Sequence, residues 1–183
     1  MRRPPLPLPG EADEQGPAAG EQQASASIRP ARPADASGLA RLLGVAFPEM
    51  EWPAERARTA LLDAPDVTAT FVVEEDGALL ATASCRHVDD RFPGLGYVHW
   101  VAVDPKTRGR GLFDLVMGSV MERFKADGRP IAVLETDDKR LPAIAAYLRL
   151  GFVPQYTEPD HEERWSRIFT ALAAGRRNSG NRK

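Results

Sequence analysis

Several features that mark particular classes of protein are scarce in this sequence of 183 residues. It has a single cysteine, Cys85, so no disulfide can form within the chain and a reducing compartment, the cytoplasm, is expected. No apolar run approaches the ~20 residues that a membrane-spanning helix needs. The formal net charge of −2 gives no whole-chain reason to expect nucleic acid or an anionic membrane as a partner.

Histidine is also scarce, and His87, His99 and His161 do not have the spacing of metal ligands. No metal site is predicted. Cys85 is a poor candidate for an acyl nucleophile, because no basic residue or helix terminus near it in the sequence would activate the thiol. The proline-rich start of the chain lacks the continuous apolar core of a signal peptide. These scarcities favour a cytoplasmic globular protein without a metal.

Composition divides the chain into three parts. Residues 1–26 are mainly Pro, Glu, Gln, Ala, Gly and Ser, with little to bury, so a disordered arm is expected there. Residues 27–174 have the composition of one folded domain, in a chain that is 43% apolar and 27% charged. Residues 175–183 are basic and poor in apolar side chains, which predicts a flexible tail.

Hydrophobic periodicity predicts alternating strands and helices within this domain. Asp35 is expected to cap the first helix, and Asp76-Gly77 is a hairpin signal. Apolar residues at helical spacing from Leu112 to Phe124 predict the longest helix. Strands are expected at residues 27–32, 68–76, 78–88, 96–103, 130–136 and 152–156, and further helices at residues 51–62, 141–150 and 161–172. An α/β (α+β) domain with a mixed sheet follows.

One segment joins the expected central strand to the longest helix, and it reads VHWVAVDPKTRGRGLFDLV. The N–H groups of a first helical turn lack intrahelical partners, and with the helix dipole they attract anions. Gly109 and Gly111 let an anion approach the main chain, while Arg108 and Arg110 add charge that suits phosphate. A pyrophosphate site is therefore predicted. A glycine-rich turn with two solvated arginines stays open as the alternative.

Two nucleotide motifs fit this segment poorly. A P-loop requires Gly-Lys-Ser/Thr, but Gly111 is followed by Leu112 and Phe113. A dinucleotide fingerprint requires a third glycine where this chain has Asp114, and a carboxylate against a pyrophosphate is unfavourable. The anion expected here is therefore held in another way.

Four segments, in order, resemble the GNAT superfamily of N-acetyltransferases. VAVDP followed by RGRG is similar to the acetyl-CoA motif Arg/Gln-x-x-Gly-x-Gly/Ala, through Arg108 and Gly111. PIAVLET resembles the next strand, AIAAYLRLGF resembles the helix with a Tyr and a Gly-Phe ending, and IRPARPAD resembles the usual opening. The resemblance implies an acyl-CoA N-acyltransferase fold, in which helices flank a mixed, mostly antiparallel central sheet.

The resemblance also implies acetyl-CoA as co-substrate. It assigns main-chain groups of Val101 and Val103 to the pantetheine arm. It assigns the pyrophosphate to the N–H groups of Arg108, Gly109, Arg110, Gly111, Leu112 and Phe113. Phe113 replaces the small residue that commonly ends this loop. Arg140 stands where many members have Asn, and it would either reach a CoA phosphate or be solvated.

Three side chains are candidates for proton transfer during direct attack of an amine on the thioester. The resemblance makes Tyr147 the general acid for the leaving sulfur; the alternative is a Tyr that packs its helix on the sheet. The resemblance also makes His99, on the same strand face as Tyr97, a base or water-mediated relay, a task that a pKa near ~6.5 suits; the alternative is a core histidine. Glu135 is an alternative base or acceptor contact, or else an ordinary carboxylate at a strand end.

The resemblance implies that the acceptor binds near residues 46–56, where the first two helices are connected. Glu49 and Glu51 could attract a cationic amine, and Phe47 and Trp52 could stack on it, although ordinary surface acids and a packing Trp remain open. The predicted function is an acetyl-CoA-dependent N-acetyltransferase that modifies a primary amine, with a small molecule favoured over a protein. The alternative is a non-catalytic acyl-CoA-binding regulatory module on the same fold. The resemblance also allows a homodimer.

Overall fold

The computed structural model describes residues 26–180, with the side chains of residues 26–175. Its centre is a five-stranded sheet in the order β1-β2-β3-β4-β5. The strands are β1 (Ser27–Pro30), β2 (Val67–Glu75), β3 (Ala78–Arg86), β4 (Gly96–Val103) and β5 (Ala132–Val133). β1 to β4 are antiparallel neighbours, and β5 joins β4 in parallel. The expected mixed, mostly antiparallel sheet is confirmed.

The hairpin between β2 and β3 forms where the sequence predicts it. Asp76 has a φ of 49° and Gly77 a φ of 75°. Left-handed conformations at both central residues are what a two-residue turn matched to the strand twist requires.

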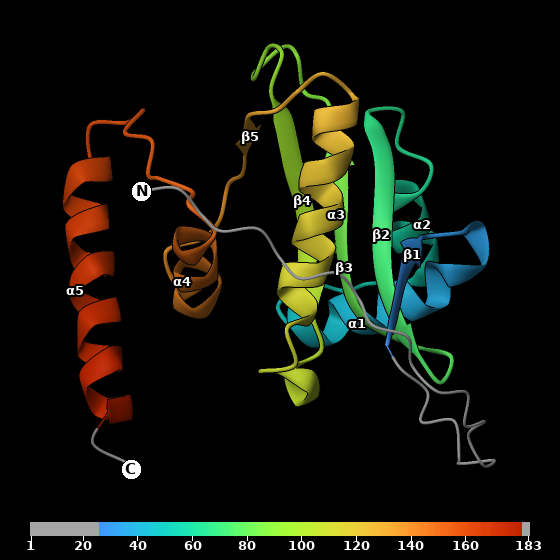
Figure 1. Ribbon diagram of the computed structural model, residues 1–183, viewed down its shortest axis with the longest axis horizontal. Coiled ribbons are helices and arrows are strands. Elements are labelled where there is room, and N and C mark those ends of the chain that lie inside the picture. Colours follow the sequence, from blue (N-terminus) through green and yellow to red (C-terminus); the bar gives the residue numbers. More distant parts are fainter. Residues whose placement is uncertain (1–25, 181–183) are drawn as a thin grey trace, which may run out of the picture.

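Helices cover both faces of the sheet (Figure 1). α1 (Ala36–Ala46) and α2 (Ala54–Leu61) pack on one face, and α3 (Leu112–Ala126) packs on the other. Gly96 shows how closely α3 approaches β4, because a Cβ at this position would lie 2.4 Å from the Phe124 ring. The two short helices η1 (Pro33–Asp35) and η2 (Pro105–Thr107) precede α1 and α3.

The C-terminal part departs from the expected pattern. α4 (Leu141–Arg149) forms as predicted, but residues 152–156 make no strand, and β5 contains two residues instead of seven. A β-prone segment becomes a strand only where a neighbour accepts its hydrogen bonds, and Pro154 cannot donate one. Figure 1 shows α5 (His161–Gly180) beside α4 and away from the sheet. α5 continues past the boundary expected at residue 174. The expected arm at residues 1–26 lies, but for Ala26, outside the described residues, as do residues 181–183.

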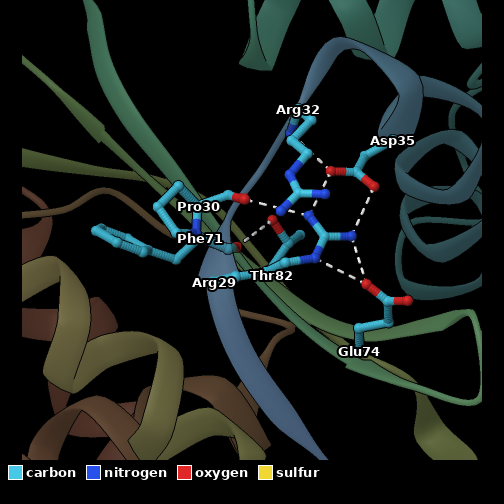
Figure 2. A network of polar contacts seen from close by, with 7 residues as sticks. All are labelled: Arg29, Pro30, Arg32, Asp35, Phe71, Glu74 and Thr82. Atoms are coloured by element: carbon cyan, nitrogen blue, oxygen red, sulfur yellow. Dashed lines mark hydrogen bonds and ion pairs between the residues drawn. The ribbon is translucent and has the colours of Figure 1, made fainter.

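The sequence predicts that Asp35 caps the first helix, but its carboxylate makes no capping hydrogen bond to that helix (Figure 2). Asp35 does precede α1, but its carboxylate accepts from the Arg29 guanidinium at 2.7 and 2.9 Å and from the Arg32 main-chain N–H at 2.6 Å. Arg29 also donates from Nε to Glu74 at 2.8 Å. The half-buried guanidinium outcompetes the helix amides for the carboxylate, and the network ties β1 and β2 to the start of α1.

Candidate functional site

The site begins where β4 and β5 separate. β5 pairs with β4 only at Gly96 and Tyr97, so the C-terminal half of β4 has a free edge on that side. Opposite Ala83, β4 has a bulge, with two residues facing one, and Trp100 in this bulge has a φ of 42°. That value is unusual for a bulky residue. The free edge includes Val101 and Val103, the strand residues that the sequence analysis assigned to the cofactor arm.

A cavity of about 610 Å³ fills the gap between the strands. It is bounded by β4, by the end of β5 and the loop that follows, by α4, and by the loop between α1 and α2. Its walls bring together Tyr147, His99 and Glu135, the three predicted proton-transfer residues. Val101 and Arg140 also line it, whereas none of Arg108–Phe113 does.

The glycine-rich loop leads directly into α3, as predicted. The buried Asp104 carboxylate accepts from the Lys106 N–H at 2.9 Å, and the Thr107 hydroxyl donates to the Asp104 carbonyl at 2.9 Å. Gly109 and Gly111 have φ values of 82° and 75°. A Cβ at either glycine would meet nothing within 4 Å, so the backbone conformation, and not crowding, requires glycine here. The N–H groups of the first turn of α3 begin directly after this loop, a suitable place for an anion.

The two loop arginines differ. Arg108 is exposed, and no acidic side chain pairs with it among residues 26–175. Arg110 donates to the Glu75 carboxylate at 2.9 and 2.5 Å. The Arg110 charge that the sequence analysis assigned to a phosphate is therefore shared with an internal carboxylate at the end of β2, and no local sequence pattern indicates this pairing.

Phe113, the bulky residue at the end of the loop motif, packs inward. It belongs to the apolar layer around α3, and its ring centroid lies 5.5 Å from that of Tyr147. Phe152 contacts the same tyrosine at 5.8 Å. The two phenylalanines hold the Tyr147 ring beside the cavity. Burial raises the pKa of Tyr147 to about 12, so the phenol carries its proton at neutral pH.

His99 also lines the cavity, in a setting that keeps its imidazole neutral. Burial, and then the nearby Arg86 guanidinium, lower its pKa to about 4. Nε2 of His99 lies 3.4 Å from Nη1 of Arg86, and the Tyr97 ring lies 5.9 Å from the imidazole. The pKa near 6.5 expected from the sequence is thus displaced downward, and the imidazole is a weak base.

Glu135 reaches the cavity as a paired carboxylate. Arg91 donates to it at 2.7 Å, and the Tyr97 hydroxyl donates at 2.9 Å. These hydrogen bonds lower the pKa of Glu135, with Arg91 the largest cause. Glu135 is therefore ionised at neutral pH and already shared between two donors.

Arg140 has partners that the sequence analysis did not indicate. Its guanidinium lies 4.3 Å over the Phe47 ring, donates from Nε to Asp137 at 2.9 Å, and pairs through Nη2 with Glu49. Arg140 thus links the start of α4 to the loop after α1, and its contact with a CoA phosphate stays a prediction. The link depends on Glu49, which only the folded chain brings across from a position 91 residues away.

Sequence reasoning missed Trp100 and Lys139, which also line the cavity. Strict alternation along β4 puts Trp100 on the face opposite to His99, but the bulge turns it so that both line the cavity. Trp100 contacts Phe47 at 5.2 Å and Trp52 at 4.6 Å in edge-on arrangements. The sequence analysis had already named Phe47 and Trp52. It missed Trp100 because no local motif predicts the bulge in β4 that turns this side chain.

Residues 26–180 contain no helix long and apolar enough to cross a membrane. They also contain no group of three or more His, Cys, Asp or Glu side chains that could hold a metal ion. Cys85 is buried, and burial raises the pKa of its thiol to about 12, which suppresses the thiolate that a nucleophile needs.

A family model and several proteins of known activity match parts of this chain. A model of the acetyltransferase (GNAT) family matches residues 38–152. Mycothiol acetyltransferase from Streptomyces coelicolor is 32% identical over 94 residues, which are 51% of this chain and 29% of that protein. S-(2-succino)cysteine N-acetyltransferase from Bacillus subtilis is 33% identical over 90 residues, 46% of this chain and 54% of that one. This chain therefore spans about half of these relatives or less.

Solved structures show the same fold at low sequence identity. Aminoglycoside N-acetyltransferase AAC(6')-Iy in complex with CoA has a TM-score of 0.63 at 18% identity, over 77% of this chain and 99% of that one. Glucosamine-6-phosphate N-acetyltransferase from Arabidopsis thaliana has a TM-score of 0.59 at 21% identity, over 73% of this chain and 95% of that one.

Proposed function

Because this chain belongs to the GNAT acetyltransferase family, we propose that it transfers the acetyl group of acetyl-CoA to a primary amine of a small molecule. The observation that carries this proposal is the gap between β4 and β5, which opens onto a cavity beside a glycine-rich helix start. The names of the relatives, which describe N-acetylation of small molecules, support the choice of acceptor class. The cavity volume also lies in the range of small-molecule sites.

The described residues fit acetyl-CoA. Main-chain groups of Val101 and Val103 on the free edge of β4 would pair with the pantetheine arm. The N–H groups of Arg108–Phe113, with the exposed Arg108 charge, would hold the pyrophosphate. Gly109 and Gly111, with their left-handed φ values, leave open space beside the main chain for the pyrophosphate. When bound, acetyl-CoA supplies a thioester that an amine can attack without an acyl-enzyme.

Tyr147 would donate a proton to the leaving sulfur. The Tyr147 phenol lines the cavity and carries its proton at neutral pH, so a proton is present there to donate. The acceptor ammonium must also lose a proton before it attacks. His99 would relay that proton as a neutral imidazole, and Glu135 would orient the acceptor from the opposite side. Both are weak bases, so we expect solvent to take the proton in the end.

The weakness of both bases also favours a second candidate, a non-catalytic acyl-CoA-binding regulatory module. The two functions share the glycine-rich loop and differ in turnover. Thiol release from acetyl-CoA should therefore be measured across a panel of small primary amines, with and without the protein. Acetylation of any amine at a rate above the background supports the enzyme. Binding of CoA without turnover of any amine supports the module.

Binding itself can be tested by thermal unfolding. Acetyl-CoA should raise the melting temperature, because it binds the folded state. Gly111→Glu should abolish the rise, since it places bulk and negative charge in the loop and a side chain on a left-handed backbone. Gly118→Glu is the matched control, because Gly118 lies on the same helix with open space around it. An equal rise in all three proteins would contradict the assignment of the pyrophosphate to this loop.

A further inference from the structure

Opposite charges from two walls of the cavity meet at Arg140. Glu49 comes from the loop between α1 and α2, while Asp137 precedes α4 and Arg140 is its N-terminal flanking residue. Arg140 pairs with both carboxylates, and its guanidinium carbon lies 4.3 Å from the centroid of the Phe47 ring. All four residues line the cavity. These residues, with Lys139, are called the acceptor wall below.

Each carboxylate that lines the cavity already has an ion-pair partner within the chain. Arg140 pairs with Glu49 and Asp137, and Arg91 pairs with Glu135. A polycationic acceptor would therefore find no unpaired carboxylate among the described residues that line the cavity. This arrangement argues against an acceptor recognised by several positive charges.

The two cations of the acceptor wall, Lys139 and Arg140, are only partly engaged by the carboxylates around them. The Lys139 ammonium lies 4.0 Å from Glu49, at the outer limit of an ion pair, and its side chain is 69% exposed. Nη1 of Arg140 has no hydrogen-bond partner among the described residues, since its two bonds come from Nε and Nη2. A guanidinium offers a planar fork that matches a carboxylate, so Nη1 can contribute to binding a carboxylate of a ligand.

The pair of Arg140 and Glu49 is also easily exchanged. The Glu49 side chain is 40% exposed, and an ion pair with a partner at this exposure adds little stability because water solvates the free carboxylate well. A carboxylate on a ligand can therefore replace Glu49 on the guanidinium at low cost. The Phe47 and Trp100 rings beside it provide an apolar surface for the rest of a small molecule.

On this basis, and resting on the proposed function, we propose that the acceptor is a small amine that also carries a carboxylate, as an amino acid does. Its carboxylate binds Arg140 and Lys139 in place of Glu49. Its amine points along α4 toward Tyr147, two helical turns further on. The Arg140 charge acts on the Tyr147 phenol, which supports their lying on one side of the cavity.

Matched acceptors test this inference. Initial rates are measured with acetyl-CoA and a panel of amino acids with apolar side chains. Each amino acid is compared with its primary amide and with its decarboxylated amine. We expect kcat/KM to be at least about tenfold higher for the carboxylates, as for the loss of a charge-assisted hydrogen bond. Arg140→Gln should raise KM for the amino acids by a similar factor and leave that for the amides nearly unchanged. Glu49→Gln should lower KM for the amino acids.

Arg164→Gln is the matched control, because it breaks a comparable ion pair, with Asp138, outside the cavity. This variant should change neither the KM for the amino acids nor the KM for the amides. Equal kcat/KM for amides and amino acids would overturn the inference while leaving the proposed acetyltransfer intact. An equal loss for both classes in Arg140→Gln would also overturn it, since that marks a structural role. If no amine of either class is acetylated, the proposed function itself fails.

Discussion

The glycine-rich loop and the acceptor wall are both proposed to bind a charged ligand group, but they differ in what carries the charge. At the loop, the proposed donors are main-chain N–H groups, and the supporting contacts connect residues two or three apart, such as Asp104 with Lys106. In the acceptor wall, long side chains carry the charge, and its main contact joins Glu49 to Arg140, 91 residues apart. A main-chain site is defined by local conformation, whereas a side-chain site is defined by packing.

Their partners differ as well. The N–H groups at the start of α3 have no competing acceptor within their own helix. In both regions an arginine side chain already pairs with a carboxylate of the chain. Arg110 of the loop pairs with Glu75, and Arg140 of the acceptor wall pairs with Glu49. Ligands would therefore add to the backbone contacts but must compete for the side-chain contacts. Three predictions test this difference.

The largest effect is expected at Tyr147, which packs against Phe113 from the loop and lines the cavity. Tyr147→Phe should lower turnover by roughly 10²–10⁴-fold, as expected for a positioned acid, because it removes only the hydroxyl. Its CoA affinity, measured by calorimetry, should stay near that of the parent. Wild-type turnover in this variant, with chemistry shown to limit the rate, would exclude Tyr147 as the general acid.

A smaller effect is expected at Glu75, the carboxylate that competes for Arg110. Glu75→Gln should tighten CoA binding by about three- to fivefold, as expected from a partly exposed ion pair. The gain should vanish when Arg110 is already Met, because no guanidinium is left to release. Glu122→Gln, which removes one negative charge from the exposed surface of α3, serves as the control. A gain that persists in the Arg110→Met background would mean that only the overall charge matters.

The smallest effect is a pH dependence of stability at His99. The native pKa of about 4 lies below the ~6.5 of an unfolded histidine, so the unfolded chain binds more protons between these values. Stability should therefore fall as the pH drops from about 6.5 toward 4. In His99→Gln, the loss of melting temperature between pH 7 and 5 should be smaller by ~4 °C. Identical pH profiles for the two proteins would show that burial and Arg86 do not hold the imidazole neutral.

Much of the fold could be predicted from local patterns. The hairpin at Asp76-Gly77, the start of α3 after Gly111 and the helix that carries Tyr147 all appear where the sequence places them. In each of these cases, a few adjacent residues decide the backbone conformation. The strand expected at residues 152–156 failed because a strand depends on a partner elsewhere in the chain, and β5 is too short to provide one.

The sequence by itself determined the glycine-rich loop, because left-handed φ values and free helix amides arise within a few adjacent residues. It also supplied Tyr147, His99, Glu135 and Arg140 as candidates. Only the tertiary structure decided the ionisation and partners of these side chains. It buried His99 beside Arg86 and set Glu49 against Arg140. The physical reason is that desolvation and ion pairing depend on which distant residues the packed elements bring together, and neither periodicity nor spacing along the chain contains that information.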